Sequence, residues 1–172
     1  MDFARAPGAY REVSVVQAFY VCNWVHDRLW DLGFTEAAGN FQTDNFGRGG
    51  HGNDAVLVDV QDGGGFNNAN ISVLPDGSAP RIQMYIFDGP TPKRDAALDA
   101  EVLIHEYVHG LSDRLVGGGV GMAAWQSWGL GEGWSDWYAL TLLSTPEDDP
   151  GGCYASGAYV TWQLLGLTSN YY

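Results

Sequence analysis

Residues 105 to 109 read His-Glu-Tyr-Val-His, a spacing that places two imidazoles one helical turn apart. Side chains four residues apart lie on the same face of an α-helix, so His105 and His109 can bind one metal ion together. Imidazole nitrogens are typical zinc ligands. Glu106 lies about 100° around the helix from His105, close enough to take a proton from a water molecule at the metal. The pattern therefore predicts metal-assisted hydrolysis.

A catalytic zinc ion has three protein ligands and one open position, so a third donor is expected. Glu132 is the candidate, in the segment Gly-Leu-Gly-Glu-Gly-Trp-Ser-Asp-Trp at 129 to 137. Asp136 follows one helical turn later, and we expect it to accept the remaining ring N–H of His105 and fix that ring's tautomer. Two alternatives remain: a solvent-facing helix for the histidines, and a solvated helix start for the acids, where carboxylates favour the helix dipole.

Three helices are expected to position these side chains. They cover residues 12 to 32, residues 95 to 116 with Asp95 as a possible cap, and residues 132 to 143. We expect residues 117 to 131 to be a glycine-rich loop that folds back toward the histidines. The buried face of the first helix is predicted from apolar residues at three- and four-residue spacing: Val15, Phe19, Cys22, Val25 and Leu29.

Three extended stretches precede the histidine-bearing helix. Alternating apolar residues predict strands over 56 to 60 and 81 to 87, and a further extended stretch covers roughly residues 68 to 74; we expect the three to form one sheet. In the stretch from 81 to 87, Ile82, Met84 and Ile86 are expected to lie on one side.

Composition restricts the class of protein. Of 172 residues, 45% are hydrophobic and 17% are charged, as in a single globular domain. The net charge of −13 disfavours nucleic acids and anionic membranes as partners, and it leaves carboxylates available for Ca²⁺.

No run approaches the ~20 apolar residues of a membrane span. No secretory signal is visible, so the signal of an exported protein would lie outside this chain. Cys22 and Cys153 are either free buried thiols or, in an exported protein, a pair.

Several motifs together resemble the fungalysin family of zinc metallopeptidases, which are relatives of thermolysin. The similarity runs from about residue 14 to the end. The motifs that carry it are His-Glu-Tyr-Val-His-Gly-Leu-Ser at 105 to 112, Gly-Glu-Gly-Trp-Ser-Asp at 131 to 136, Gly-Phe-Thr-Glu-Ala-Ala-Gly-Asn-Phe-Gln at 33 to 42, Asn-Asn-Ala-Asn at 67 to 70, and the stretch from Arg81 to Arg94.

The resemblance assigns a role to each matching residue. It implies zinc ligation by His105, His109 and Glu132, with Glu106 as the general base. It also implies that Asn68 and Ala69 form an edge-strand segment that pairs with the substrate backbone, in agreement with the general binding of peptides by strand addition. The alternative for these two residues is an ordinary sheet edge.

The resemblance also implies an α+β, zincin-like fold: a small mixed sheet packed on helices, one of which carries the His-Glu-Tyr-Val-His motif. We expect residues 1 to 172 to form a single, partial catalytic domain, with residues 1 to 11 irregular and the family's C-terminal helical lobe missing. That lobe supplies a histidine that stabilises the oxyanion, and neither His26 nor His51 matches its position. Exposed apolar surface is expected where the lobe would pack.

The predicted function is a secreted, extracellular zinc endopeptidase that binds one Zn²⁺ and cleaves protein or peptide substrates. By resemblance, it prefers an apolar residue after the cut bond and is made as a precursor with a propeptide. One alternative is a zinc-binding fragment or pseudoenzyme that does not turn over. A second is a Ca²⁺-stabilised binding module, suggested by several aspartates without regular calcium-loop spacing: Asp54, Asp59, Asp62, Asp76 and Asp88.

Overall fold

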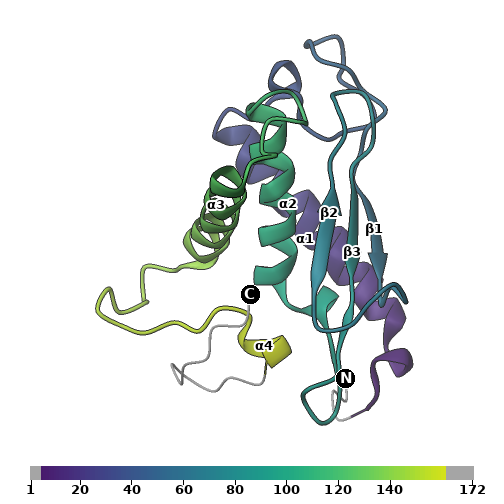
Figure 1. The fold of residues 1–172 in the computed structure, drawn as a ribbon, viewed down its shortest axis with the longest axis vertical. Helices are drawn as coiled ribbons and strands as arrows, with labels where there is room; N and C mark the ends of the chain where they lie inside the picture. Colours follow the sequence, from purple (N-terminus) through teal and green to yellow (C-terminus); the bar gives the residue numbers. More distant parts are fainter. Residues whose placement is uncertain (1–4, 162–172) are drawn as a thin grey trace.

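In a computed structural model, the chain folds into three long helices beside a small sheet (Figure 1). The structure describes residues 5–161. The helices are α1 (Arg11–Asp31), α2 (Ala100–Leu115) and α3 (Trp125–Leu143). The central helix, α2, contacts α1, α3 and the sheet. In Figure 1, α3 and the sheet lie on opposite sides of α2. The predicted α+β class with a small mixed sheet is confirmed.

The main sheet has three strands in the order β1-β3-β2. These are β1 (Leu57–Val60), β2 (Ala69–Ser72) and β3 (Arg81–Met84). The pair β1 and β3 is parallel, whereas β2 and β3 are antiparallel, with Ala69 opposite Met84. The prediction that the three stretches form one sheet is confirmed, and β2 lies at an edge.

The third predicted strand is shorter than expected. It ends at Met84, and β4 (Ile86–Phe87) belongs instead to a two-stranded sheet with β5 (Arg94–Asp95). The backbone of Tyr85 explains the break, because its N–H donates to Asn68 O while its carbonyl accepts from Ala96 N. Ile86 is therefore not part of the row that Ile82 and Met84 form.

The first helix has the expected extent but buries a different face. Its buried residues are Ser14, Ala18, Val21, Val25 and Leu29. The predicted Val15 and Phe19 are 52% and 71% exposed. The first half of α1 is apolar on several sides, so spacing alone does not select the face. Small side chains select the buried face, because Ser14 and Ala18 allow close packing against the segment that precedes α2.

Both later helices begin elsewhere than predicted. Asp95 caps a short 3₁₀ helix (Ala96–Leu98) by accepting from Ala97 N, whereas Asp99 caps α2 by accepting from Glu101 N. The third helix begins at Trp125 rather than at Glu132, so part of the expected loop is helical. The predicted helix start at Glu132 is wrong, and Glu132 lies in the helix interior.

Glycines inside α3 account for this difference. They weaken a helix in isolation, which is why the segment reads as a loop. Packing does not require glycine at Gly131, because a Cβ there would lie at ordinary contact distances of 3.4 Å from Met122 Cε and 3.6 Å from His109 Nδ1. The segment nevertheless packs closely along α2. Tertiary contact with α2 therefore overrides the local propensity and places Glu132 beside the histidines.

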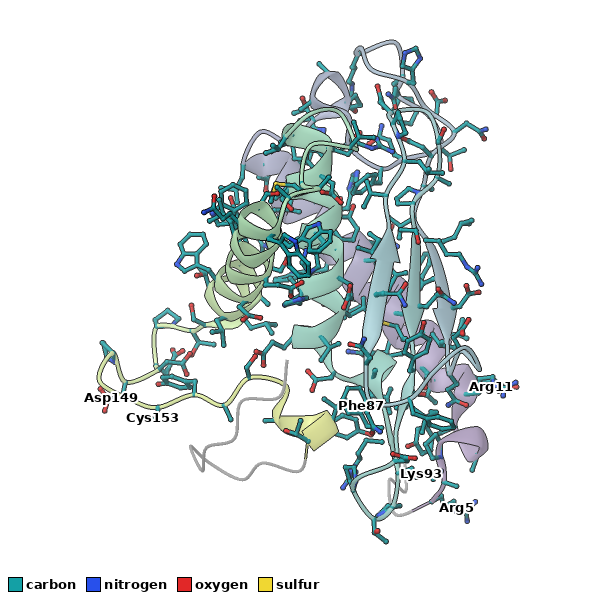
Figure 2. All side chains as sticks on the ribbon, viewed as in Figure 1. Arg5, Arg11, Phe87, Lys93, Asp149 and Cys153 are labelled. Atoms are coloured by element: carbon teal, nitrogen blue, oxygen red, sulfur yellow. The ribbon has the colours of Figure 1, made fainter. Side chains whose placement is uncertain are left out.

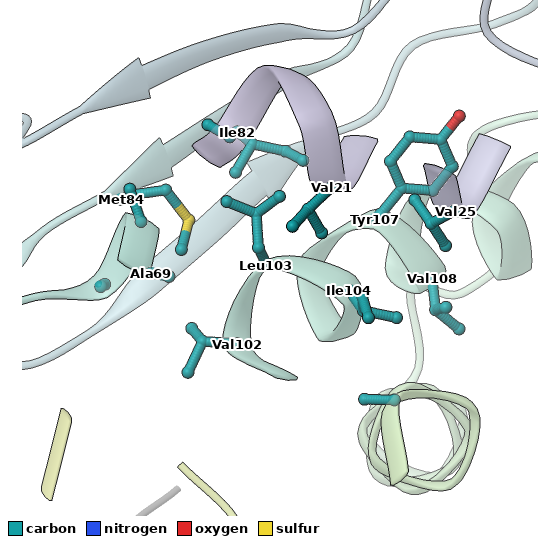
Figure 3. Packing of buried hydrophobic residues seen from close by; sticks show 14 of the residues in the cluster. Val21, Val25, Ala69, Ile82, Met84, Val102, Leu103, Ile104, Tyr107 and Val108 are labelled. Atoms are coloured by element: carbon teal, nitrogen blue, oxygen red, sulfur yellow. The ribbon is translucent and has the colours of Figure 1, made fainter. Parts of the chain in front are cut away.

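The core lies around α2. Every residue of α2 from Val102 to Val108 is buried. Figure 3 shows Leu103 between Val21 of α1 and Ile82 and Met84 of β3, with Tyr107 beside Val21 and Val25. The helix that carries the two histidines is thus held on several sides by close-packed side chains.

Arg114 fixes the last turn of α2 to the loops around it. Its side chain is almost fully buried and pairs with Asp54 at 3.0 Å. The guanidinium also donates to three backbone carbonyls, those of Gly39, Leu74 and Ser78. One side chain thus holds three separate loop segments together.

Replacing Arg114 with methionine is expected to lower the free energy of unfolding by about 3–5 kcal/mol. The substitution leaves a buried charge on Asp54 and three carbonyls without their donor. Urea denaturation followed by circular dichroism measures the change. Arg28→Met, at an exposed position of α1, is the control, with an expected change below about 1 kcal/mol. Equal stability of the two variants would contradict this role for Arg114.

The outer surface of α3 is apolar. Trp125 and Trp137 are 84% and 59% exposed, and Leu130, Leu140 and Leu143 are also exposed. Exposed apolar surface is therefore present, whereas the packing of a further lobe against it stays a prediction. No helix in the described residues is long and apolar enough to cross a membrane.

The two cysteines are free thiols. Cys22 is partly buried on α1, and burial raises its pKa to about 12. Cys153 is exposed on the loop between α3 and the short α4 (Ala158–Thr161), as Figure 2 shows. The expectation of free thiols is confirmed for both residues, but that of burial is wrong for Cys153.

Candidate metal centre

Three donor atoms converge between α2 and α3. His105 Nε2 lies 3.0 Å from His109 Nε2 and 3.1 Å from Glu132 Oε2, and His109 Nε2 lies 3.4 Å from the same oxygen. Tetrahedral zinc with bonds of about 2.0–2.2 Å has ligand atoms about 3.4 Å apart. The chemistry of the donor set fits zinc, and the distances come close to the required spacing. Within residues 5–161, no other group of three or more His, Cys, Asp or Glu side chains converges in this way.

Asp136 lies beside the trio, one turn after Glu132 on α3. Its Oδ1 lies 2.8 Å from His105 Nδ1. A carboxylate accepts a hydrogen bond from the N–H of that nitrogen, so the lone pair of His105 Nε2 is directed at the other two donor atoms. The arrangement holds the ring in the tautomer that a metal ion requires.

Replacing Asp136 with alanine is expected to weaken zinc binding about 10- to 100-fold. The substitution removes the acceptor that fixes the His105 ring and raises its basicity. Competition with a chromophoric chelator measures the affinity. Asp31→Ala, at an exposed position of α1, is the control for lost negative charge. An affinity of the Asp136 variant equal to that of the control would show that Asp136 does not orient the ligand.

The pKa values of the two histidines shift in opposite directions from their ordinary value. Burial lowers the pKa of His105, but the hydrogen bond to Asp136 and the negative charges of Glu106, Asp136 and Glu132 outweigh it, and the net shift is upward. Burial and the neighbouring His105 lower the pKa of His109, against the opposing effect of Glu132. The pair is therefore not readily protonated twice, which keeps imidazole nitrogen available to a metal ion.

Glu106 is the third titrating group. Its side chain is 7% exposed, and burial raises its pKa to about 7; His105 counters the shift and the charge of Glu132 adds to it. A carboxyl group with a pKa near neutrality both accepts and releases a proton readily. Glu106 therefore has the acidity of a general base.

One cleft of about 400 Å³ contains the trio, Glu106 and the edge strand β2. The lining residues come from β2 and the residue before it, from α2, from α3 and from the loop that joins the two helices. Asn68 is exposed, Ala69 is buried, and both line the cleft. The structure thus brings together all the residues that the sequence singled out for metal, base and substrate: His105, His109, Glu132, Glu106, Asn68 and Ala69.

The two other histidines lie elsewhere. His26 is partly buried on α1 and hydrogen-bonds to Gln42 and Asn40, and His51 is exposed. Both agree with the expectation that neither belongs to the site.

The aspartates considered for Ca²⁺ do not converge. Asp54 and Asp76 pair with Arg114, and Asp59 and Asp62 pair with Arg81. Asp88 accepts from the side chain of Asn67. Each of these two arginines thus offsets part of the negative charge of two carboxylates, which lowers their tendency to bind a cation.

Four cleft residues were missed in the sequence: Asp113, Met122, Ser127 and Trp128. Three of them lie in the segment expected to be a loop. Asp113 carried a usable signal, because it follows His109 by four residues and so lies on the same helical face.

An α+β fold with two histidines, a carboxylate and a further glutamate in one cleft has the features of a metallopeptidase. Comparison with known families agrees, since residues 2–172 match the fungalysin metallopeptidases (M36). The chain belongs to this family, as its motifs indicated.

Similar proteins carry related names. The chain is 45% identical over 172 residues to extracellular metalloproteinase 3 of Trichophyton soudanense, a match that covers 98% of this chain and 44% of the relative. The proteins of the same name from Trichophyton rubrum and Arthroderma otae are also 45% identical, with 27% of their length covered. The chain thus spans less than half the length of these relatives.

Proposed function

We propose that the chain is the zinc-binding part of a secreted endopeptidase with a zincin-like active site. His105, His109 and Glu132 hold one Zn²⁺, and Glu106 is the general base. The observation that carries this proposal is the convergence of three donor atoms, at 3.0–3.4 Å from one another, in a cleft that Glu106 also lines.

The proposed mechanism is hydrolysis of a peptide bond by water. A bound zinc ion supplies Lewis acidity, which polarises the scissile carbonyl and lowers the pKa of water. Glu106 accepts a proton from the attacking water through its carboxylate and returns it to the leaving amine. Asp136 holds His105 in position throughout.

Substrate binding is assigned to β2. The strand lies at the edge of the sheet and lines the cleft next to Glu106. An extended peptide placed against Asn68 and Ala69 adds a strand to the sheet, which aligns its backbone with the metal centre. An apolar preference after the cut bond and a propeptide in the precursor are further elements of the proposal.

Secretion is inferred from the relatives, which are named extracellular metalloproteinases. The acidic charge of −13 agrees with a protein that binds neither nucleic acid nor an anionic membrane surface. Ca²⁺ as an additional stabilising ion stays a prediction.

A second candidate is a zinc-binding fragment that does not turn over. The chain spans 44% or less of the relatives just named, and within the described residues the cleft contains no third imidazole to stabilise an oxyanion. Losing one such donor costs about 10²–10³ in rate.

Casein cleavage by the purified chain distinguishes the two candidates. A working peptidase degrades casein with zinc, stops after treatment with a chelator and recovers when zinc is restored. A chain that binds zinc but leaves casein intact over long incubation would contradict the peptidase and establish the zinc-binding fragment.

A further inference from the structure

Asp113 is a carboxylate in the cleft wall that the proposed hydrolysis does not use. It lies in the last turn of α2, four residues after His109, and its side chain is partly buried. The carboxylate makes no hydrogen bond or ion pair with any side chain or backbone group in the part of the chain that the structure describes. By contrast, Glu132 and Asp136 in the same region contact a histidine.

Such a carboxylate is energetically unfavourable where it is. Partial burial removes water from the charged group, and burial raises the pKa of Asp113 with no opposing partner. A cation brought by a ligand would remove this cost. The free protein therefore carries a group whose charge is balanced only when something binds.

The charges of the cleft lead to the same conclusion. Its lining contains three acids, Glu106, Asp113 and Glu132, and no lysine or arginine. A divalent ion held by the trio balances two of these negative charges. The third, on Asp113, stays uncompensated in the cleft wall. The acidic protein as a whole also attracts basic ligands over longer distances.

The neighbouring wall suits a long cationic side chain. Trp128 lines the same cleft and is 49% exposed, and Met122 is a further residue of the lining. An aromatic ring attracts a cation above its face, and an apolar surface accommodates the methylene groups of lysine or arginine. A carboxylate and an indole in one cleft thus match the charged end and the methylene groups of such a side chain.

We propose that Asp113 and Trp128 form a subsite that binds a lysine or arginine side chain of the peptide substrate. The proposal rests on the proposed peptidase function. Four helical residues separate Asp113 from His109 by about 6 Å along the axis, and an extended peptide rises about 3.3 Å per residue. The basic residue therefore lies within about two positions of the scissile bond.

The test uses peptides that differ only in one residue near the scissile bond, which is lysine, its uncharged analogue norleucine, or glutamate. The residue is moved through two positions on each side, and kcat/KM is measured for the zinc-loaded full chain. We expect the lysine peptide to be preferred over norleucine at one position by about tenfold, a typical effect of a partly exposed charge-assisted contact. In Asp113→Asn this preference of lysine over norleucine falls to within twofold.

Binding provides a second readout that does not require turnover. The same peptides are titrated into zinc-loaded Glu106→Gln protein, with and without Asp113→Asn, and followed by fluorescence anisotropy. Asp31→Asn is the control with the same change in charge at an exposed site. If Asp113→Asn and Asp31→Asn keep the same lysine-to-norleucine ratio as the parent in binding, the subsite is overturned. If no peptide is cleaved but the ratio in binding depends on Asp113, the subsite stands and the proposed catalysis fails.

Discussion

Replacing Glu106 with glutamine is expected to reduce peptide hydrolysis by about 10³-fold or more while zinc stays bound. Glutamine has nearly the same shape but cannot accept a proton, and general bases contribute about 10²–10⁴ to the rate. The buried carboxyl, with its pKa raised to about 7, is not one of the proposed metal ligands and directly follows His105 in the cleft lining. Initial rates on a quenched peptide, with zinc content measured on the same sample, give both quantities.

Glu12→Gln is the matched control for Glu106→Gln, since Glu12 is exposed in the first turn of α1. It should retain wild-type activity. A Glu106→Gln variant within about tenfold of the wild-type rate would show that another group activates the water.

Replacing Glu132 with alanine is expected to weaken zinc binding by more than about a hundredfold. The free energy of zinc binding to protein sites is about 10–16 kcal/mol and is shared by three or four ligands. Loss of one ligand therefore removes about 3 kcal/mol of binding free energy. The position is specific, because the 3.1 Å and 3.4 Å distances to the two imidazoles both depend on this carboxylate. Chelator competition measures the affinity.

The control for Glu132→Ala is Glu147→Ala, on the exposed loop that follows α3. Its zinc affinity should equal that of the wild type. Unchanged affinity in Glu132→Ala would mean that the third ligand comes from elsewhere in the chain.

The metal centre was largely predictable because its main element is local. A spacing of four residues puts His105 and His109 on one face of any helix, whatever surrounds that helix. The role of Asp136 follows from the same rule once Glu132 is placed on α3. The helix start was not predictable, because the glycines of α3, Gly131 among them, disfavour a helix locally, and the contacts with α2 that outweigh them are long-range.

Which face of a helix is buried, and which residues line the cleft, depend on long-range contacts. The buried face of α1 is set by Ser14 and Ala18, which pack against segments far away in the sequence. Trp128 reaches the cleft only because α3 begins early. Periodicity shows which residues share a face, but not which of two apolar faces meets the core.

Elemental analysis of the purified wild-type chain is the most direct test of the metal centre. We predict one equivalent of zinc per folded chain, displaced by a strong chelator and regained when zinc is added back. A folded sample that contains no zinc, and takes up none in the presence of excess zinc, would contradict the account.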